Sequence, residues 1–139
     1  MAENLTFAMI KPGSVSRNEV GAILSLIESN GFRIVALKKI QLTLSDISLF
    51  YKDHIGKNYF EDLEQYMTSG PVVPLVLEKE NAVKAFRTLL GKTDPEQAAE
   101  GTIRKLFATA KNRNACHGAD SDENAAYEMS CFFSKTNLL

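Results

Sequence analysis

The sequence predicts an α+β fold in which strands and helices alternate. Residues 5–11 (LTFAMIK) are apolar at successive positions, as in a strand that is covered on both faces. Over residues 20–27 and 81–90, apolar side chains recur at spacings of three and four, which is typical of helices that pack on a sheet. Residues 32–42 and 71–79 have the composition of two further strands.

The remaining segments complete this order. Thr43 and Asp46 form a capping signal ahead of one helix, and residues 60–67 continue as a second short helix. Residues 122–133 begin with a helical pattern and end in CFF, which we interpret as a fourth strand. The order β-α-β-(αα)-β-α-β predicts a ferredoxin-like βαββαβ fold: an antiparallel four-stranded sheet with helices on one face and an extra helical pair between the second and third strands. Pro74 lacks an amide donor, so a bulge or an unpaired position is expected in the third strand.

Composition limits the class of protein. With 139 residues the chain is expected to form a single domain, residues 1–139, around one core. The formal net charge of -1 provides no broad basic surface, so no specific nucleic-acid partner is expected. Cys116 and Cys131 form no CxxC pair, which favours a reducing compartment. The longest apolar run, PVVPLVL, is too short to cross a bilayer, so we expect no membrane partner and a cytoplasmic location.

Several polar residues stand where they could serve a site, and the pattern alone leaves two interpretations open for each. Lys11 ends a buried strand, while Arg87 and Arg104 lie on predicted helices. Each of these cations could bind phosphate or simply face solvent. His117 lies in the polar turn NACHGADS, where a histidine can be a catalyst or a bystander.

Four motifs occur in order along nearly the whole chain. They are FAMIKPGSV near the N-terminus, YMTSGPVV in the middle, then GTIR, and finally NACHGADS. In this order and spacing they resemble the nucleoside diphosphate kinase family, whose members have F-x-M-I-K-P-x-x-V, M-x-S-G-P-V, G-T-I-R and N-x-x-H-G-S-D-S. The resemblance runs from about residue 5 to about residue 133, and it implies the same ferredoxin-like fold that the pattern predicts.

The resemblance implies a phosphotransferase. It implies transfer of the terminal phosphoryl group of a nucleoside triphosphate, mainly ATP, to nucleoside diphosphates through a phosphohistidine, in ping-pong fashion. His117 aligns with the nucleophile, and Glu128 aligns with the residue that holds the second ring nitrogen. Lys11 and Tyr51 are assigned with them to the catalytic group. The alternative is a nucleotide-binding regulatory protein of the same fold with weak or lost catalysis.

The resemblance also implies a nucleotide site and the cofactor Mg²⁺, which would arrive with the nucleotide and bridge phosphate oxygens. Tyr59 stands where the family usually has Phe, and its ring would stack on the base. Asp120 is expected near the waters of the metal ion. The other aligned positions are Lys11, Arg87, Arg104, Thr93 and Tyr51 for the phosphates and Asn114 for the ribose.

Two further expectations follow from the resemblance. Family members assemble from dimers, so a homo-oligomer is expected, either a tetramer or a hexamer. Ala119 replaces the serine that usually follows His-Gly, which removes a hydroxyl beside the glutamate that holds the histidine. We expect this replacement to reduce the stability of the phosphoenzyme or the rate, without loss of activity.

Overall fold

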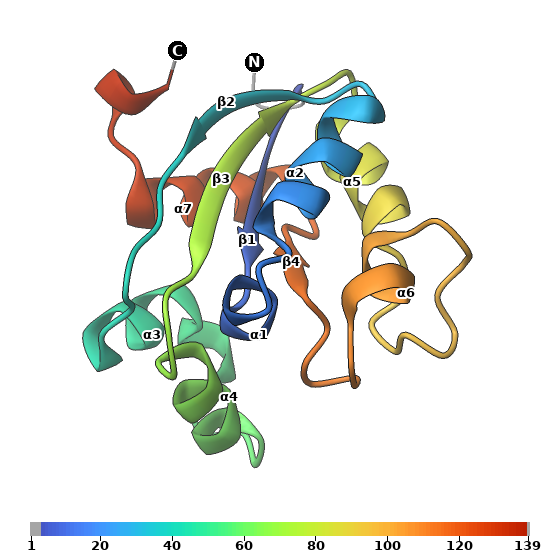
Figure 1. Cartoon of the computed structure of the whole chain (residues 1–139). Coiled ribbons are helices and arrows are strands. Elements are labelled where there is room, and N and C mark those ends of the chain that lie inside the picture. Colours follow the sequence, from blue (N-terminus) through green and yellow to red (C-terminus); the bar gives the residue numbers. More distant parts are fainter. Residues whose placement is uncertain (1–3, 139) are drawn as a thin grey trace.

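The computed structural model describes residues 4–138, and its four strands form one antiparallel sheet (Figure 1). In space the strands follow the order β2-β3-β1-β4, so β1 and β3 are central. Every neighbouring pair runs antiparallel, which confirms the predicted ferredoxin-like fold class. The strands are β1 (Leu5–Ile10), β2 (Arg33–Leu37), β3 (Val73–Glu78) and β4 (Cys116–Gly118).

Alternate residues of β1 enter two cores, one on each face of the sheet. Phe7 and Met9 face the core that is covered by α3 and α7, whereas Ala8 and Ile10 face the core under α2 and α5. Figure 1 shows α2 in front of the sheet, α5 next to α2, and α7 behind the sheet. The prediction of helices on one face is therefore wrong, because a strand that is apolar on both faces needs cover on both. The covering helices are α2 (Val20–Ser29), α3 (Leu44–Phe50), α5 (Ala82–Leu90) and α7 (Asp122–Phe132).

The segment between β2 and β3 forms the predicted extra helical pair. At the start of α3, the amide of Asp46 donates to the Thr43 hydroxyl and the amide of Thr43 donates to the Asp46 carboxylate, as the capping signal predicted. The short 3-10 helix η2 (Lys52–His54) and α4 (Phe60–Met67) follow. No helix among residues 4–138 is long and apolar enough to cross a membrane. The other described helices are α1 (Pro12–Ser16), α6 (Ile103–Phe107) and η3 (Lys135–Asn137).

The fourth strand lies where the sequence predicted a loop. β4 consists of three residues of NACHGADS and pairs with β1, with His117 opposite Met9. The apolar end of residues 122–133 is instead the last turn of α7, whose N-cap Ser121 accepts a hydrogen bond from the amide of Asn124. A strand of three residues is too short to show an alternating pattern, and for this reason the sequence-based placement of the fourth strand was wrong.

Pro74 lies where the sheet ladder is interrupted. Its carbonyl accepts a hydrogen bond from the amide of Lys38 at 3.2 Å. The amide and the carbonyl of one strand residue point to the same side, so the missing donor faces the β2 edge. There β2 has ended at Leu37, and pairing resumes only in the isolated bridge between Ile40 and Val72. The structure agrees with the expected unpaired position.

Gly118 is expected not to tolerate a side chain. A Cβ at this position would lie 2.9 Å from Phe86 and 3.0 Å from Leu90, which are both buried. We expect Gly118→Ala to lower the free energy of unfolding by about 1–3 kcal/mol, because adding a methyl group to a filled core forces its neighbours to move. In the control variant Gly70→Ala, the new Cβ meets Pro12 at an ordinary contact distance of 3.9 Å. Urea denaturation at fixed subunit concentration measures both variants, and equal stabilities would contradict the prediction.

Candidate active site

His117 lies at the centre of a group of polar side chains around β4. Its Nε2 is 2.9 Å from Oε1 of Glu128, which α7 places beside the sheet edge. Phe7 and Phe50 pack against the imidazole, with ring centroids 6.1 Å and 5.3 Å away. Because a carboxylate only accepts, the proton of the neutral ring belongs on Nε2, and Nδ1 carries the lone pair. The ring is thereby held in one orientation with a free lone pair, which is the arrangement that a nucleophilic histidine requires.

A strained turn leads the chain into β4. The amide of Cys116 donates to the carbonyl of Asn114 at 2.9 Å, across Ala115, whose φ angle is 76°. An i to i+2 hydrogen bond around a residue of positive φ is the geometry of the rare γ-turn. The Ala115 carbonyl accepts a hydrogen bond from the amide of Lys11 at 2.9 Å, which ties this turn to the end of β1. Because an alanine does not indicate such a turn, the turn at Ala115 could not be predicted from the sequence.

The ammonium group of Lys11 is almost fully buried beside this turn. Lys11 is 9% exposed, and its Nζ donates to Oδ1 of Asn114 at 2.7 Å. Burial, together with the positive charge of Arg104, lowers the pKa of Lys11 from 10.5 to about 8. An ammonium group has three donors, so an anion can still bind beside the amide of Asn114.

Two arginines flank His117 along β4. Arg104 of α6 is 6% exposed and donates to the carbonyl of Cys116 at 3.1 Å. Burial lowers the pKa of Arg104 to about 10, and its Nε has no hydrogen-bond partner among the described residues. On the other side, Arg87 of α5 donates to the carbonyl of Gly118 at 3.2 Å. The structure thus brings three predicted cations to the strand that carries the histidine, in a form that fits an anion.

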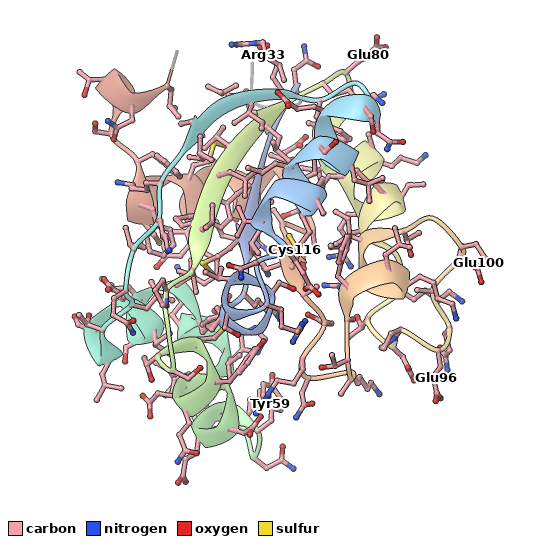
Figure 2. All side chains as sticks on the ribbon, viewed as in Figure 1. Arg33, Tyr59, Glu80, Glu96, Glu100 and Cys116 are labelled. Atoms are coloured by element: carbon pink, nitrogen blue, oxygen red, sulfur yellow. The ribbon has the colours of Figure 1, made fainter. Side chains whose placement is uncertain are left out.

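Three more predicted residues differ in how far they are buried. Tyr51 is buried, its ring centroid is 6.5 Å from that of His117, and its hydroxyl has no partner among the described residues. Burial raises the pKa of Tyr51, so the hydroxyl keeps its proton. Tyr59 is 47% exposed at the start of α4, and Figure 2 shows it well below Cys116 at the lower end of the molecule. Thr93 is exposed between α5 and α6, and no hydrogen bond among residues 4–138 joins it to the His117 group.

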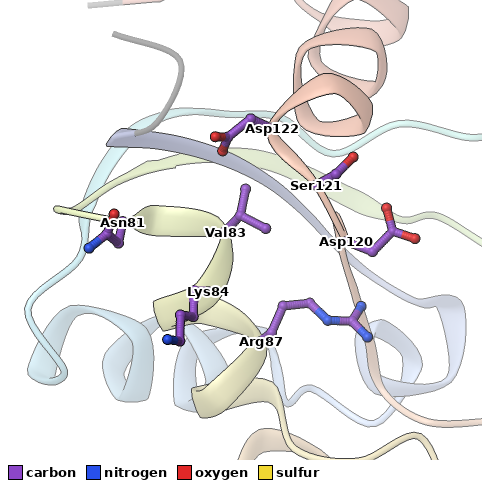
Figure 3. A pocket seen from close by; sticks show the side chains of 7 residues that line it. All are labelled: Asn81, Val83, Lys84, Arg87, Asp120, Ser121 and Asp122. Carbon is purple, nitrogen blue, oxygen red and sulfur yellow. The ribbon is translucent and has the colours of Figure 1, made fainter.

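Asp120 lines an open pocket beside Arg87. The pocket has a volume of about 410 Å³, and Figure 3 shows these two side chains at its edge. The exposed Asp120 carboxylate accepts a hydrogen bond from the side-chain amide of Asn124. Among residues 4–138, no cluster of three His, Cys, Asp or Glu side chains could hold a metal ion. A cation at this place would therefore need oxygen ligands from a substrate or from water.

A salt bridge that sequence reasoning missed connects α4 with the chain that leads into β4. Arg113 donates to both carboxylate oxygens of Asp62, at 3.1 Å and 3.2 Å. The same guanidinium lies 4.0 Å from the ring centroid of Tyr66, whose hydroxyl accepts a hydrogen bond from the amide of Gly13. Because 51 residues separate Arg113 from Asp62, no local pattern could have revealed this contact.

Together, the fold and the site define an α+β enzyme for nucleophilic chemistry on anions. An imidazole held by a carboxylate can serve as a nucleophile, and the buried cations Lys11 and Arg104 near it can attract negatively charged groups. The fold, the motif order and this cation set agree with the family that the sequence resembles.

Comparisons with known proteins identify the family. A family model described as nucleoside diphosphate kinase matches residues 4–138. Nucleoside diphosphate kinases of Flavobacterium psychrophilum and Chlorobaculum tepidum are 50% and 51% identical over 133 and 134 residues, with 96% of each chain covered. The solved nucleoside diphosphate kinase of Aquifex aeolicus superposes with a TM-score of 0.95 at 38% identity, covering 98% of this chain and 99% of that one. A halophilic nucleoside diphosphate kinase from Halobacterium salinarum in complex with CDP gives a TM-score of 0.93 at 32% identity, covering 99% and 91%. The chain belongs to the nucleoside diphosphate kinase family and is by this membership a phosphotransferase.

The lowered pKa of Lys11 is open to direct titration. We expect the NMR signals of its side chain, assigned by their loss in Lys11→Gln, to titrate with a midpoint near pH 8. In the unfolded chain the pKa of Lys11 returns to 10.5. Between about pH 8 and pH 10.5 the unfolded chain therefore binds more protons than the folded protein, so the contribution of Lys11 to the free energy of unfolding rises with pH. The same deprotonation removes a positive charge, so kcat/KM for a phosphate-bearing substrate is expected to fall above about pH 8. A midpoint above about pH 10 would show that burial does not perturb this group.

Proposed function

We propose that this chain transfers the terminal phosphoryl group of a nucleoside triphosphate, mainly ATP, to a nucleoside diphosphate through a phosphohistidine on His117. The observation that carries the proposal is the bond between His117 Nε2 and Glu128, on a strand whose carbonyls before and after the histidine each hold an arginine. The nucleophile and its cations are all present, so nothing in the site favours the alternative of a regulatory protein without catalysis.

The first half-reaction forms a bond between nitrogen and phosphorus. Nδ1 of His117 attacks the terminal phosphorus in line, and the bond from that phosphorus to the bridging oxygen breaks, which releases the nucleoside diphosphate. The ring then carries positive charge, which the Glu128 carboxylate stabilises through Nε2. In the second half-reaction, a terminal oxygen of another nucleoside diphosphate attacks the phosphorus and displaces Nδ1. No proton has to be transferred in either direction.

Charge stabilisation is the task of the surrounding donors. The leaving diphosphate and the equatorial oxygens of the moving group carry negative charge, which Lys11, Arg87 and Arg104 can balance. The hydroxyl of Tyr51 is protonated and has no partner among the described residues, so it is available to donate to a phosphate oxygen. Thr93 would complete this set once a nucleotide is bound. Lys11, Arg104 and Tyr51 are buried, and donors in such a place act more strongly than in water.

The nucleoside would lie between Asn114 and Tyr59. The Asn114 amide already bonds to Lys11, and it would contact the ribose hydroxyls. Tyr59 offers an exposed ring on which any base can stack, which predicts weak discrimination between bases. A relative from Halobacterium salinarum is described in complex with CDP, a nucleoside diphosphate, which supports this class of ligand.

We further propose that the divalent cation of the reaction is Mg²⁺, held mainly by substrate oxygens and water. The exposed Asp120 carboxylate beside Arg87 fits a contact to those waters, whereas residues 4–138 contain no group of three His, Cys, Asp or Glu side chains that could hold a metal ion. The ion would neutralise phosphate charge.

We also propose that the protein is cytoplasmic and forms a homo-oligomer built from dimers, either a tetramer or a hexamer. Because β2 lies at the edge of the sheet, a second copy of the chain could pair with this strand.

The phosphoenzyme itself is the sharpest test. Incubation with γ-labelled ATP should give the wild type an acid-labile, base-stable label, and GDP should remove this label as labelled GTP. His117→Asn should acquire none, because an amide nitrogen is not nucleophilic. Glu128→Gln should acquire it about 10- to 100-fold more slowly, because the residue that orients the ring and balances its charge is weakened. Equal labelling of His117→Asn and the wild type would refute the proposal.

The substitution Ala119→Ser is expected to improve the enzyme. Ala119 is buried beside β4, and among residues 4–138 His117 is the side-chain hydrogen-bond partner of the Glu128 carboxylate. In the family that the sequence resembles, a serine at this position neighbours the glutamate, so the hydroxyl of Ala119→Ser is expected to give this carboxylate a second donor and to raise the rate or the lifetime of the phosphoenzyme about two- to tenfold. Ala126→Ser, on the exposed side of α7, is the matched control. An unchanged rate and lifetime in Ala119→Ser would contradict this expectation.

A further inference from the structure

His54, which has no part in the proposed phosphoryl transfer, forms a hydrogen-bonded pair with Tyr59. Nδ1 of His54 lies 2.5 Å from the hydroxyl oxygen of Tyr59, and the two ring centroids are 5.6 Å apart at 65°. His54 ends η2 and Tyr59 precedes the first residue of α4, so the pair closes the connection between these two short helices.

The His54–Tyr59 pair contacts Tyr51, which is buried next to His117. The ring of His54 is nearly perpendicular to that of Tyr51, with centroids 5.8 Å apart, and its amide donates to the Tyr51 carbonyl at 2.8 Å. The Tyr51 ring in turn contacts the ring of His117. Three successive ring contacts therefore lead from the exposed Tyr59 through His54 and Tyr51 to the half-buried His117.

An exposed aromatic ring needs such support if it is to bind a flat ligand well. Tyr59 is 47% exposed, and it makes no side-chain capping bond at the start of α4. A ring without support would lose rotational freedom when a base stacks on it, and this loss weakens binding. A hydrogen bond to its hydroxyl group fixes the ring beforehand, which a phenylalanine at the same place would not permit.

We propose that His54 is a positioning residue for the nucleotide: its Nδ1 accepts a hydrogen bond from the hydroxyl of Tyr59 and holds that ring in the orientation that stacks on the base. This inference rests on the proposed role of Tyr59 as the platform for the base. His54 touches neither the phosphates nor the reacting nitrogen, so it acts on the affinity for the nucleotide and not on the chemical step.

A double-mutant cycle tests this role. We expect His54→Leu to raise the KM for GDP about three- to tenfold, as the loss of one hydrogen bond would, while kcat stays within about twofold. His54→Asn retains an acceptor close to the place of Nδ1 and is expected to restore most of the affinity. In a Tyr59→Phe background no hydroxyl remains to be held, so His54→Leu should then leave the KM unchanged.

Three outcomes would overturn the inference: an unchanged KM in His54→Leu, an equal rise of KM in the Tyr59→Phe background, or a fall in kcat alone. Ile55→Ala, an exposed neighbour of His54, is the matched control and should leave the KM unchanged. Tyr59→Ala separates this inference from the function on which it rests. If Tyr59→Ala leaves the KM for GDP unchanged, the base platform is wrong, whereas a raised KM in Tyr59→Ala with no effect of His54→Leu overturns only the role of His54.

Discussion

The pairing of β4 with β1 is the constraint on which the site depends. Three residues of backbone hold His117 opposite Met9, in reach of Glu128 on the helix that covers the same face. Lys11 follows directly after β1 and is bonded to the turn before β4, so the same pair of strands also places the buried ammonium. A nucleophile in a loop would have to be ordered during binding, whereas one in a sheet is ordered by folding.

The way in which Lys11, Arg87 and Arg104 are held decides what these cations can do. Arg87 and Arg104 donate to backbone carbonyls and Lys11 donates to an amide oxygen, all of which are neutral acceptors. Neutral partners fix a cation in place without cancelling its charge, as carboxylates would. The lowered pKa values of Lys11 and Arg104 show that burial disfavours their charged forms. A bound anion favours the charged forms again. Burial therefore disfavours these charges in the empty site but makes their attraction to a bound anion stronger.

Local patterns predicted most of the fold, because β1 and the helices are long enough to repeat their spacing and the cap at Thr43 is a short motif. β4 could not be predicted in this way, since three residues carry no periodicity and the CFF of α7 is apolar enough for either type of element. The side of the sheet on which each helix lies is a tertiary property, and it was predicted wrongly. Composition left the roles of Lys11, Arg87 and His117 open. Only the order of the motifs along the chain indicated that these residues belong to one site.

Two contacts at the surface, Arg113 with Asp62 and His54 with Tyr59, order segments that lie outside the core. The two segments proposed to hold the nucleoside, at Tyr59 and Asn114, lie outside the sheet, where local structure opens most easily. The salt bridge of Arg113 with Asp62 joins these segments, but an exposed ion pair of this kind contributes little to stability. Its effect is therefore on geometry, in that it fixes the distance between the segments, as the bond from His54 to Tyr59 fixes the direction of a ring. In the proposed reaction, the sheet therefore holds the reacting nitrogen, and weak pairs at the surface hold the segments that would bind the base and the ribose.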